Sequence, residues 1–168
     1  MKRISYVGLG IALVCIATML VQIPIPATKG YLNLGDSVIM VLAVLFGARF
    51  GLFVGSLGSA LADVLTGYAY WAPATFIIKG LEGLIVGLIL AKGKKSPNHF
   101  RIVCGLVCGA LVMAFGYLFA GAIMYGWAVS AADMVANLVQ GFGSTVIALP
   151  LIYALKRLRF LDKECKDL

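Results

Sequence analysis

Long apolar stretches, separated by short segments that carry proline, glycine or charge, run along nearly the whole chain. A helix that crosses a membrane needs about 20 mostly apolar residues, and the interruptions leave room for six helices. We expect them at residues 4–23, 36–47, 50–65, 74–91, 100–124 and 131–155. The second is short, so the second and third are alternatively one broken helical hairpin. The pattern predicts an all-α integral membrane protein, with six transmembrane helices in one domain over residues 1–168.

The residues that interrupt these stretches predict the connections. Pro24 and Pro26 end the first helix, because proline cannot donate a backbone hydrogen bond. An extended loop over residues 24–35 follows. Pro73 suits the first position of the fourth helix. The first 23 residues begin like a signal peptide but lack an Ala-x-Ala cleavage site, so we expect them to remain as the first helix.

Composition agrees with a membrane protein. The 168 residues are 62% hydrophobic and 12% charged, with a mean hydropathy of +1.02. Soluble domains are about 45–50% apolar and about 25% charged. A soluble domain of this length cannot bury so much apolar surface. A soluble enzyme, a disordered chain and a nucleic-acid-binding protein are therefore excluded as first interpretations.

Positive charge is distributed unevenly between the two sides of the expected bundle. The chain has 14 Lys and Arg against 7 Asp and Glu, a net charge of +7. Lys29 lies alone on one side and Lys79 lies within the fourth helix. The other cations share the second side: Lys2, Arg3, Arg49, Lys92, Lys94, Lys95, Arg101, Lys156, Arg157, Arg159, Lys163 and Lys166. The positive-inside rule then predicts that both termini are cytoplasmic.

Known catalytic and nucleotide-binding patterns are missing from the sequence. Residues 87–94 have the wrong spacing for a phosphate-binding loop, and Lys95 stands where Ser or Thr is needed. No Ser/His/Asp arrangement occurs. His99, beside the basic loop, is expected to flank the membrane interface. We therefore expect no catalytic residues, no metal and no cofactor, and any ATP that drives this protein is bound by another chain.

Ionisable residues inside apolar helices are functional candidates, because each costs roughly 2.5–3.5 kcal/mol to insert. Lys79 and Glu82 stand at i, i+3 on the fourth helix, so they can share a face. They are either a structural ion pair or a pair that faces a ligand. Asp63, on the third helix, is expected to serve in capping or packing.

Uncharged and aromatic residues extend this candidate set. Asp36 is either a helix N-cap or a ligand contact, and Asn33 is not explained by that cap. Asn137 and Gln140 either bond across helices or contact a ligand. A group of aromatic residues forms either an interfacial belt or a stacking wall for a flat ring: Tyr68, Tyr70 and Trp71.

Three runs of sequence resemble a known family. They are Ile-Pro-Ala-Thr-Lys-Gly-Tyr-Leu-Asn-Leu-Gly-Asp at 25–36, Gly-Ser-Leu-Gly-Ser-Ala-Leu-Ala-Asp at 55–63 and Ala-Pro-Ala-Thr-Phe-Ile-Ile-Lys-Gly-Leu-Glu-Gly at 72–83. In these runs, in length and in helix order, the chain resembles the substrate-binding S component of energy-coupling factor (ECF) transporters. The closest subgroup is the one associated with hydroxymethylpyrimidine and pyridoxine.

The resemblance implies a role in vitamin uptake at a bacterial plasma membrane. Such subunits capture a small vitamin near the outer face, and the loop after the first helix helps to close over it. They dock on a transmembrane coupling subunit and two ATPases and topple in the membrane to deliver the vitamin. Docking uses small residues on the first helix, which Gly8 and Ala12 match here, with Gly in place of the usual Ala.

On this basis we expect a ligand site in the outer half of the bundle. Its expected residues are Asn33, Asp36, Tyr68, Tyr70, Trp71, Lys79, Glu82, Asn137 and Gln140. A stand-alone carrier or channel and a small lipid-modifying enzyme remain as alternatives. No inverted repeat between the two halves is evident, which counts against a carrier. The sequence does not identify the vitamin.

Overall fold

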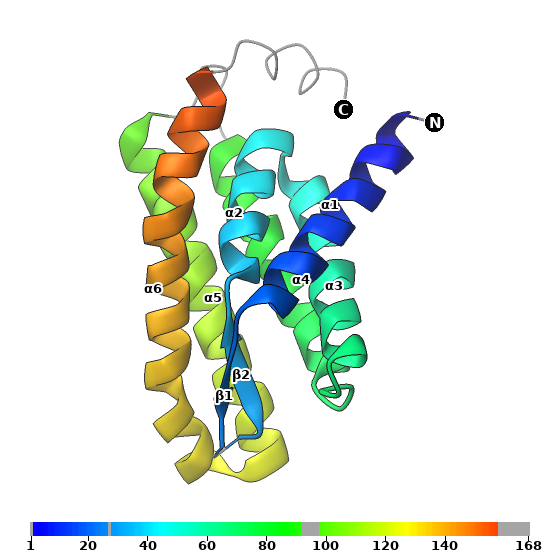
Figure 1. Ribbon diagram of the computed structural model, residues 1–168. Coiled ribbons are helices and arrows are strands. Elements are labelled where there is room, and N and C mark those ends of the chain that lie inside the picture. Colours follow the sequence, from blue (N-terminus) through cyan, green and yellow to red (C-terminus); the bar gives the residue numbers. More distant parts are fainter. Residues whose placement is uncertain (1, 27, 92–97, 158–168) are drawn as a thin grey trace.

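The computed structural model describes residues 2–26, 28–91 and 98–157 of the chain. Within them it contains six helices and one two-stranded hairpin (Figure 1). The elements are α1 (Lys2–Leu20), β1 (Gln22–Ile25), β2 (Gly30–Asn33), α2 (Gly35–Phe46), α3 (Ala48–Leu65), α4 (Ala72–Ala91), α5 (His99–Tyr125) and α6 (Trp127–Arg157). The six predicted helices are therefore present, with ends that differ by a few residues.

The largest difference from the predicted elements is the segment between α1 and α2. We expected an extended loop over residues 24–35, but the chain forms an antiparallel hairpin in which Gln22 pairs with Asn33 and Ile25 with Gly30. Strand β1 begins at Gln22, so α1 ends at Leu20 rather than near residue 23. A two-stranded hairpin has two free edges, which is where proline is tolerated in a strand. Pro24 therefore fits within β1.

A glycine separates α2 from α3. Gly47 has a φ of 90°, a left-handed conformation that glycine adopts at little cost. The chain reverses direction there, so α2 and α3 form a helical hairpin that is interrupted at Gly47.

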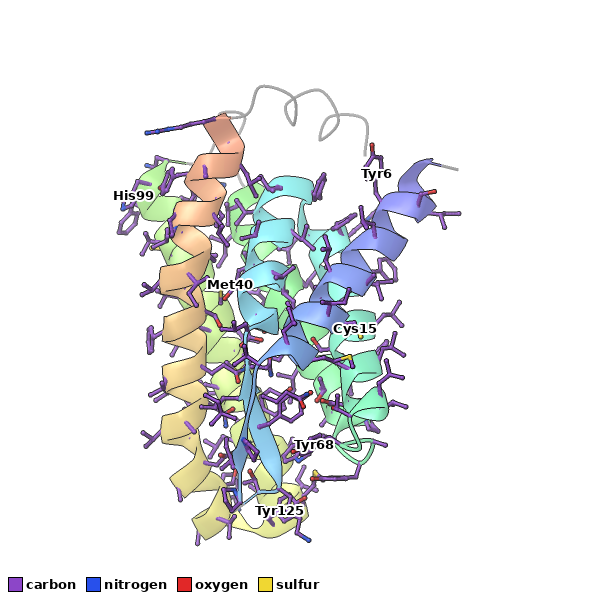
Figure 2. All side chains as sticks on the ribbon, viewed as in Figure 1. Tyr6, Cys15, Met40, Tyr68, His99 and Tyr125 are labelled. Atoms are coloured by element: carbon purple, nitrogen blue, oxygen red, sulfur yellow. The ribbon has the colours of Figure 1, made fainter. Side chains whose placement is uncertain are left out.

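The connections divide the bundle into two ends (Figure 1). Helix α1 begins and α6 finishes at one end. The hairpin tip, the α3–α4 turn and the α5–α6 turn lie at the other, which we call the hairpin end. Figure 2 places Tyr68 and Tyr125 at the hairpin end, and Tyr6 and His99 at the opposite end. The basic residues 92, 94, 95, 159, 163 and 166 lie outside the described residues.

The outer surface is apolar. Large hydrophobic side chains are strongly exposed on several helices, including Ile123 at 87%, Phe100 at 74% and Val146 at 70%. Four of the described helices, α3 to α6, are long and apolar enough to cross a membrane, while α1 and α2 provide shorter apolar stretches. An apolar exterior around a partly polar interior is the distribution that a bilayer requires. The chain is a multi-pass membrane protein.

Helices α3 and α4 pack closely because glycines face each other. A Cβ atom built on Gly51 would lie 2.6 Å from the Gly83 carbonyl oxygen, so side chains larger than hydrogen would force the helices apart. Small residues at such positions let membrane helices approach backbone to backbone. This contact fixes α4, and with it Lys79, against α3.

Candidate functional site

A cavity lies beneath the hairpin, in the half of the bundle toward the hairpin end. We call it the hairpin cavity. It is lined by Thr18, Ile25, Thr28, Gly30, Tyr31, Asn33, Ser59, Asp63, Trp71, Thr75, Lys79, Tyr117, Asp133, Asn137 and Gln140. The space available to the centres of water molecules is about 30 Å³, which corresponds to roughly two waters. Its lining combines polar and charged side chains with apolar and aromatic surface.

A buried network of charges forms the cavity floor. The Lys79 ammonium on α4 is hydrogen-bonded to a carboxylate oxygen of Asp36 on α2, and its Nζ lies 3.5 Å from a Glu82 oxygen. All three side chains are at most 2% exposed. Lys79 Nζ also lies 5.4 Å from the centre of the Tyr117 ring, within the range of a cation–π contact. The Lys79 ammonium thus interacts with two carboxylates and one aromatic ring.

Gln140 connects this network to the hairpin. Its side-chain N–H group donates to Asp36 Oδ2 at 2.8 Å, and its side-chain oxygen accepts the backbone N–H of Asn33 at 2.8 Å. Asn33 ends β2, so the base of the hairpin is bonded to α6. A buried amide that uses both its donor and its acceptor fixes its own orientation.

Three further hydrogen bonds hold the hairpin over the cavity. The Tyr31 hydroxyl donates to Asp63 Oδ1 on α3 at 2.5 Å. At the hairpin tip, the Trp71 indole N–H donates to the Thr28 carbonyl at 3.3 Å, and the Tyr70 hydroxyl donates to the Lys29 carbonyl.

Aromatic rings form one wall of the cavity. Trp71 meets Tyr117 edge to face, with ring centres 5.7 Å apart, and also contacts Tyr125 at 6.0 Å. Trp71 is only 5% exposed. Outside the cavity, Tyr68 packs on Tyr31 with ring centres 4.5 Å apart. A flat ligand ring in the cavity would face aromatic edges and faces on this side.

The structure brings most of the predicted site residues together, in two layers. Five line the cavity: Asn33, Trp71, Lys79, Asn137 and Gln140. Asp36 and Glu82 lie in the buried network that includes Lys79. Tyr68 and Tyr70 contact the hairpin from outside and do not line the cavity. The predicted pairing of Lys79 with Glu82 is present, but it is secondary to the Asp36 contact.

Two predicted local roles differ from the structure. Asp36 does not cap α2: its carboxylate oxygens accept from Lys79 and Gln140. The N–H of Gly35, the first residue of α2, is instead accepted by Asn33 Oδ1 at 2.9 Å. Asp63 does not cap α3, which ends at Leu65 with Thr66 as its C-cap residue; its buried carboxylate lines the cavity.

Several cavity residues were missed by sequence reasoning. Tyr31 and the threonines carry no signal of their own, because their contacts depend on how the hairpin folds. Asp133 does carry a sequence signal, because it precedes Asn137 by one helical turn and so lies on the same helix face. Its side chain accepts from the Asn137 amide at 3.2 Å. Asp133 could have been identified from the sequence as an acidic residue on the polar stripe of an apolar helix.

The end of the bundle opposite the cavity carries the single histidine. His99 Nδ1 lies 2.5 Å from the Tyr153 hydroxyl, and the two rings stack. Among the described residues, no group of three or more His, Cys, Asp and Glu side chains converges in a way that suits a metal ion.

Comparison with known proteins places the chain among vitamin transporters. Residues 1–157 match the family model of the S component of ECF-type riboflavin transporters. The thiamine precursor transporter HmpT of Lactococcus lactis is 30% identical over 155 residues, 90% of this chain and 87% of HmpT. An uncharacterized protein of Pyrococcus woesei is 46% identical over 144 residues, 86% of this chain and 95% of that protein. A UPF0397 protein of Streptococcus pneumoniae is 33% identical over 137 residues, 80% of this chain and 70% of its own length.

Proposed function

Because the chain belongs to the family of ECF transporter S components, we propose that it captures a small vitamin or vitamin precursor in the hairpin cavity. Members of this family are transport proteins of the membrane and not enzymes, and they work with ECF coupling and ATPase components. The observation that carries the proposal is a cavity inside an apolar bundle that is lined by aromatic rings and by buried polar and charged side chains. Sites for small molecules have this combination of apolar walls and a few placed polar groups.

Hydroxymethylpyrimidine and pyridoxine are our first choices of ligand. Both are single rings of about a dozen non-hydrogen atoms. Such small ligands reach high affinity only when nearly all of their surface is enclosed, given the limit on binding energy per atom. The similarity to HmpT, a thiamine precursor transporter, favours the pyrimidine. A single ring also demands the smallest expansion of a cavity that has room for roughly two waters.

Entry of such a ring requires the hairpin to move, because the cavity beneath it has room for only roughly two waters. The hydrogen bonds that hold the hairpin involve Tyr31, Trp71 and Gln140. They would break when the hairpin opens and re-form when it closes over the ligand. Each hydrogen bond contributes roughly 0.5–1.5 kcal/mol net. The free-energy cost of breaking all of them is therefore small enough for the hairpin to open, while their sum still favours the closed position. The hairpin then acts as the lid.

We further propose that all six helices cross the membrane as one domain, with the hairpin end outward and both termini cytoplasmic. Helix α2 has 12 residues and spans only about 18 Å at 1.5 Å per residue. The hairpin completes the crossing, so that irregular backbone lies inside the bundle, as membranes demand. The sharing of one end by the start of α1 and the finish of α6 supports this arrangement.

Docking on the coupling subunit is proposed to use α1. Gly8 and Ala12 are exposed, and a Cβ built on Gly8 would meet nothing within 4 Å. This surface is therefore open to close approach by another helix. Two ATPase subunits would drive toppling of the chain in the cell membrane, which would present the cavity to the cytoplasm.

A calorimetric screen of water-soluble vitamins and their precursors against the purified chain tests the proposal. We expect equimolar binding of one compound by the chain alone. Proteoliposomes that contain only this chain should show no flux of that compound, because flux requires the ATPases. Flux through the chain alone would identify a stand-alone carrier or channel instead.

A further inference from the structure

The acidic side chains of the described residues are all buried around the hairpin cavity. They are Asp36 at 0%, Asp63 at 3%, Glu82 at 0% and Asp133 at 9% exposure. Lys79, at 1% exposure, is the only fully buried cation among the described residues of the chain. When all of these groups are ionised, the site has three more negative than positive charges. Unbalanced charge inside a membrane protein is costly, so the excess calls for a compensating partner.

Lys79 cannot provide that compensation for the whole site, because it already serves Asp36 and Glu82. Two carboxylates that line the cavity itself are left, Asp63 and Asp133. They come from α3 and α6.

Asp63 presents one occupied and one open oxygen. Its Oδ1 accepts the Tyr31 hydroxyl at 2.5 Å. Its Oδ2 is buried and has no hydrogen-bond partner among the described residues. The nearby Thr75 hydroxyl interacts with this carboxylate, but a carboxylate accepts about four hydrogen bonds. The Asp63 carboxylate can therefore accept further hydrogen bonds from a ligand in the cavity.

Asp133 repeats the arrangement on α6. The Asn137 side-chain amide donates to its Oδ2 at 3.2 Å. Its Oδ1 is buried without a hydrogen-bond partner in the described part of the chain, and the Thr28 hydroxyl lies close enough to interact with it. A phenol thus donates to Asp63 and an amide donates to Asp133, and the second oxygen of each carboxyl group can still accept a hydrogen bond from a ligand.

We propose that Asp63 and Asp133 make the hairpin cavity selective for basic, amino-substituted ring ligands and against ligands that carry a carboxylate. The inference rests on the proposed capture function and narrows its substrate class. An amino group or protonated ring nitrogen supplies the N–H donors and positive charge that the two open oxygens lack. A carboxylate would stand near like charges in a site of low dielectric, which is strongly unfavourable.

The test compares compounds that differ in this one group. The probes are hydroxymethylpyrimidine against 4-amino-2-methylpyrimidine-5-carboxylate, and pyridoxamine against 4-pyridoxate, with binding to the purified chain measured by calorimetry. We expect the basic member of a pair to bind at least about tenfold more tightly, equivalent to 1.4 kcal/mol. Asp63→Asn and Asp133→Asn keep the side-chain shape and should each reduce this preference by about tenfold.

Arg49→Gln is the matched control, because it also changes the net charge by one but lies exposed in the first turn of α3, away from the hairpin end. It should leave the preference unchanged, and thermal melts establish that every variant is folded. Equal or tighter binding of the carboxylates by the parent chain would overturn the selectivity and leave vitamin capture intact. Absence of saturable binding by any vitamin in the wider screen would contradict both proposals.

Discussion

Lys79 on α4 and Asp36 on α2 form a buried ion pair although they are 43 positions apart in the sequence. The pair joins two helices directly below the hairpin, and Gln140 extends it to Asn33 at the hairpin base. The stability of the bundle and the position of the lid are therefore coupled through one set of polar contacts.

The first prediction concerns this pair. Lys79→Met leaves two buried carboxylates without a cation and should lower the free energy of unfolding by roughly 3–5 kcal/mol. Adding Asp36→Asn and Glu82→Leu removes the unpaired charges and should restore most of that loss while abolishing ligand binding. Denaturant or thermal unfolding in detergent measures both effects. A single variant as stable as the parent would mean that the ion pair is absent.

The second prediction concerns the lid. Trp71→Phe keeps an aromatic ring but removes the N–H donor to the Thr28 carbonyl. Loss of a hydrogen bond worth roughly 0.5–1.5 kcal/mol should make ligand dissociation about two- to thirteenfold faster, as measured by stopped flow. Trp127→Phe is the control, since Trp127 is 62% exposed and packs on Phe119. If both variants release the ligand at the parent rate, the hydrogen bond from Trp71 to the hairpin tip does not hold the lid closed.

The third prediction separates docking from folding. Gly8→Leu and Ala12→Trp place bulk on the exposed face of α1, and should abolish uptake in cells while leaving vitamin binding by the isolated chain unchanged. Gly83→Leu places the same bulk in the α3–α4 contact and should instead destabilise the fold and lower binding. If uptake survives both α1 changes, the docking surface lies elsewhere.

The fourth prediction concerns membrane orientation. In a chain whose four native cysteines are replaced, a single cysteine at position 29, in the hairpin turn, should react with an impermeant reagent on intact cells. A single cysteine at position 94 should react only after the membrane is permeabilised. The reverse labelling pattern would invert the proposed topology.

Helix number and order could be predicted from sequence because apolar length and breaker residues determine them locally. The hairpin could not, since its strands are four residues each and their pairing depends on contacts with α3, α6 and the α3–α4 turn. Lys79 and Glu82 were identifiable as a pair from their spacing alone. The Asp36 partner was not, because the packing of α2 against α4 decides it.

The same reasoning explains the aromatic residues. Tyr68, Tyr70 and Trp71 are adjacent in sequence and were considered as one group, yet only Trp71 lines the cavity. The turn after α3 directs the three rings differently, and the spacing of the three residues does not show which ring turns inward. Tyr117 and Asp63 line the cavity because close glycine contacts fix their helices.

Binding of the ligand found in the vitamin screen, compared between the parent chain and Asn137→Leu, tests the proposed site most directly. Asn137 lines the cavity and is 7% exposed, and leucine is of similar size but offers no hydrogen bonds. By calorimetry, we predict equimolar binding to the parent and to Gly8→Leu, and affinity at least about tenfold weaker for a folded Asn137→Leu variant. A folded Asn137→Leu chain that binds the vitamin as tightly as the parent would contradict the placement of the ligand in the hairpin cavity.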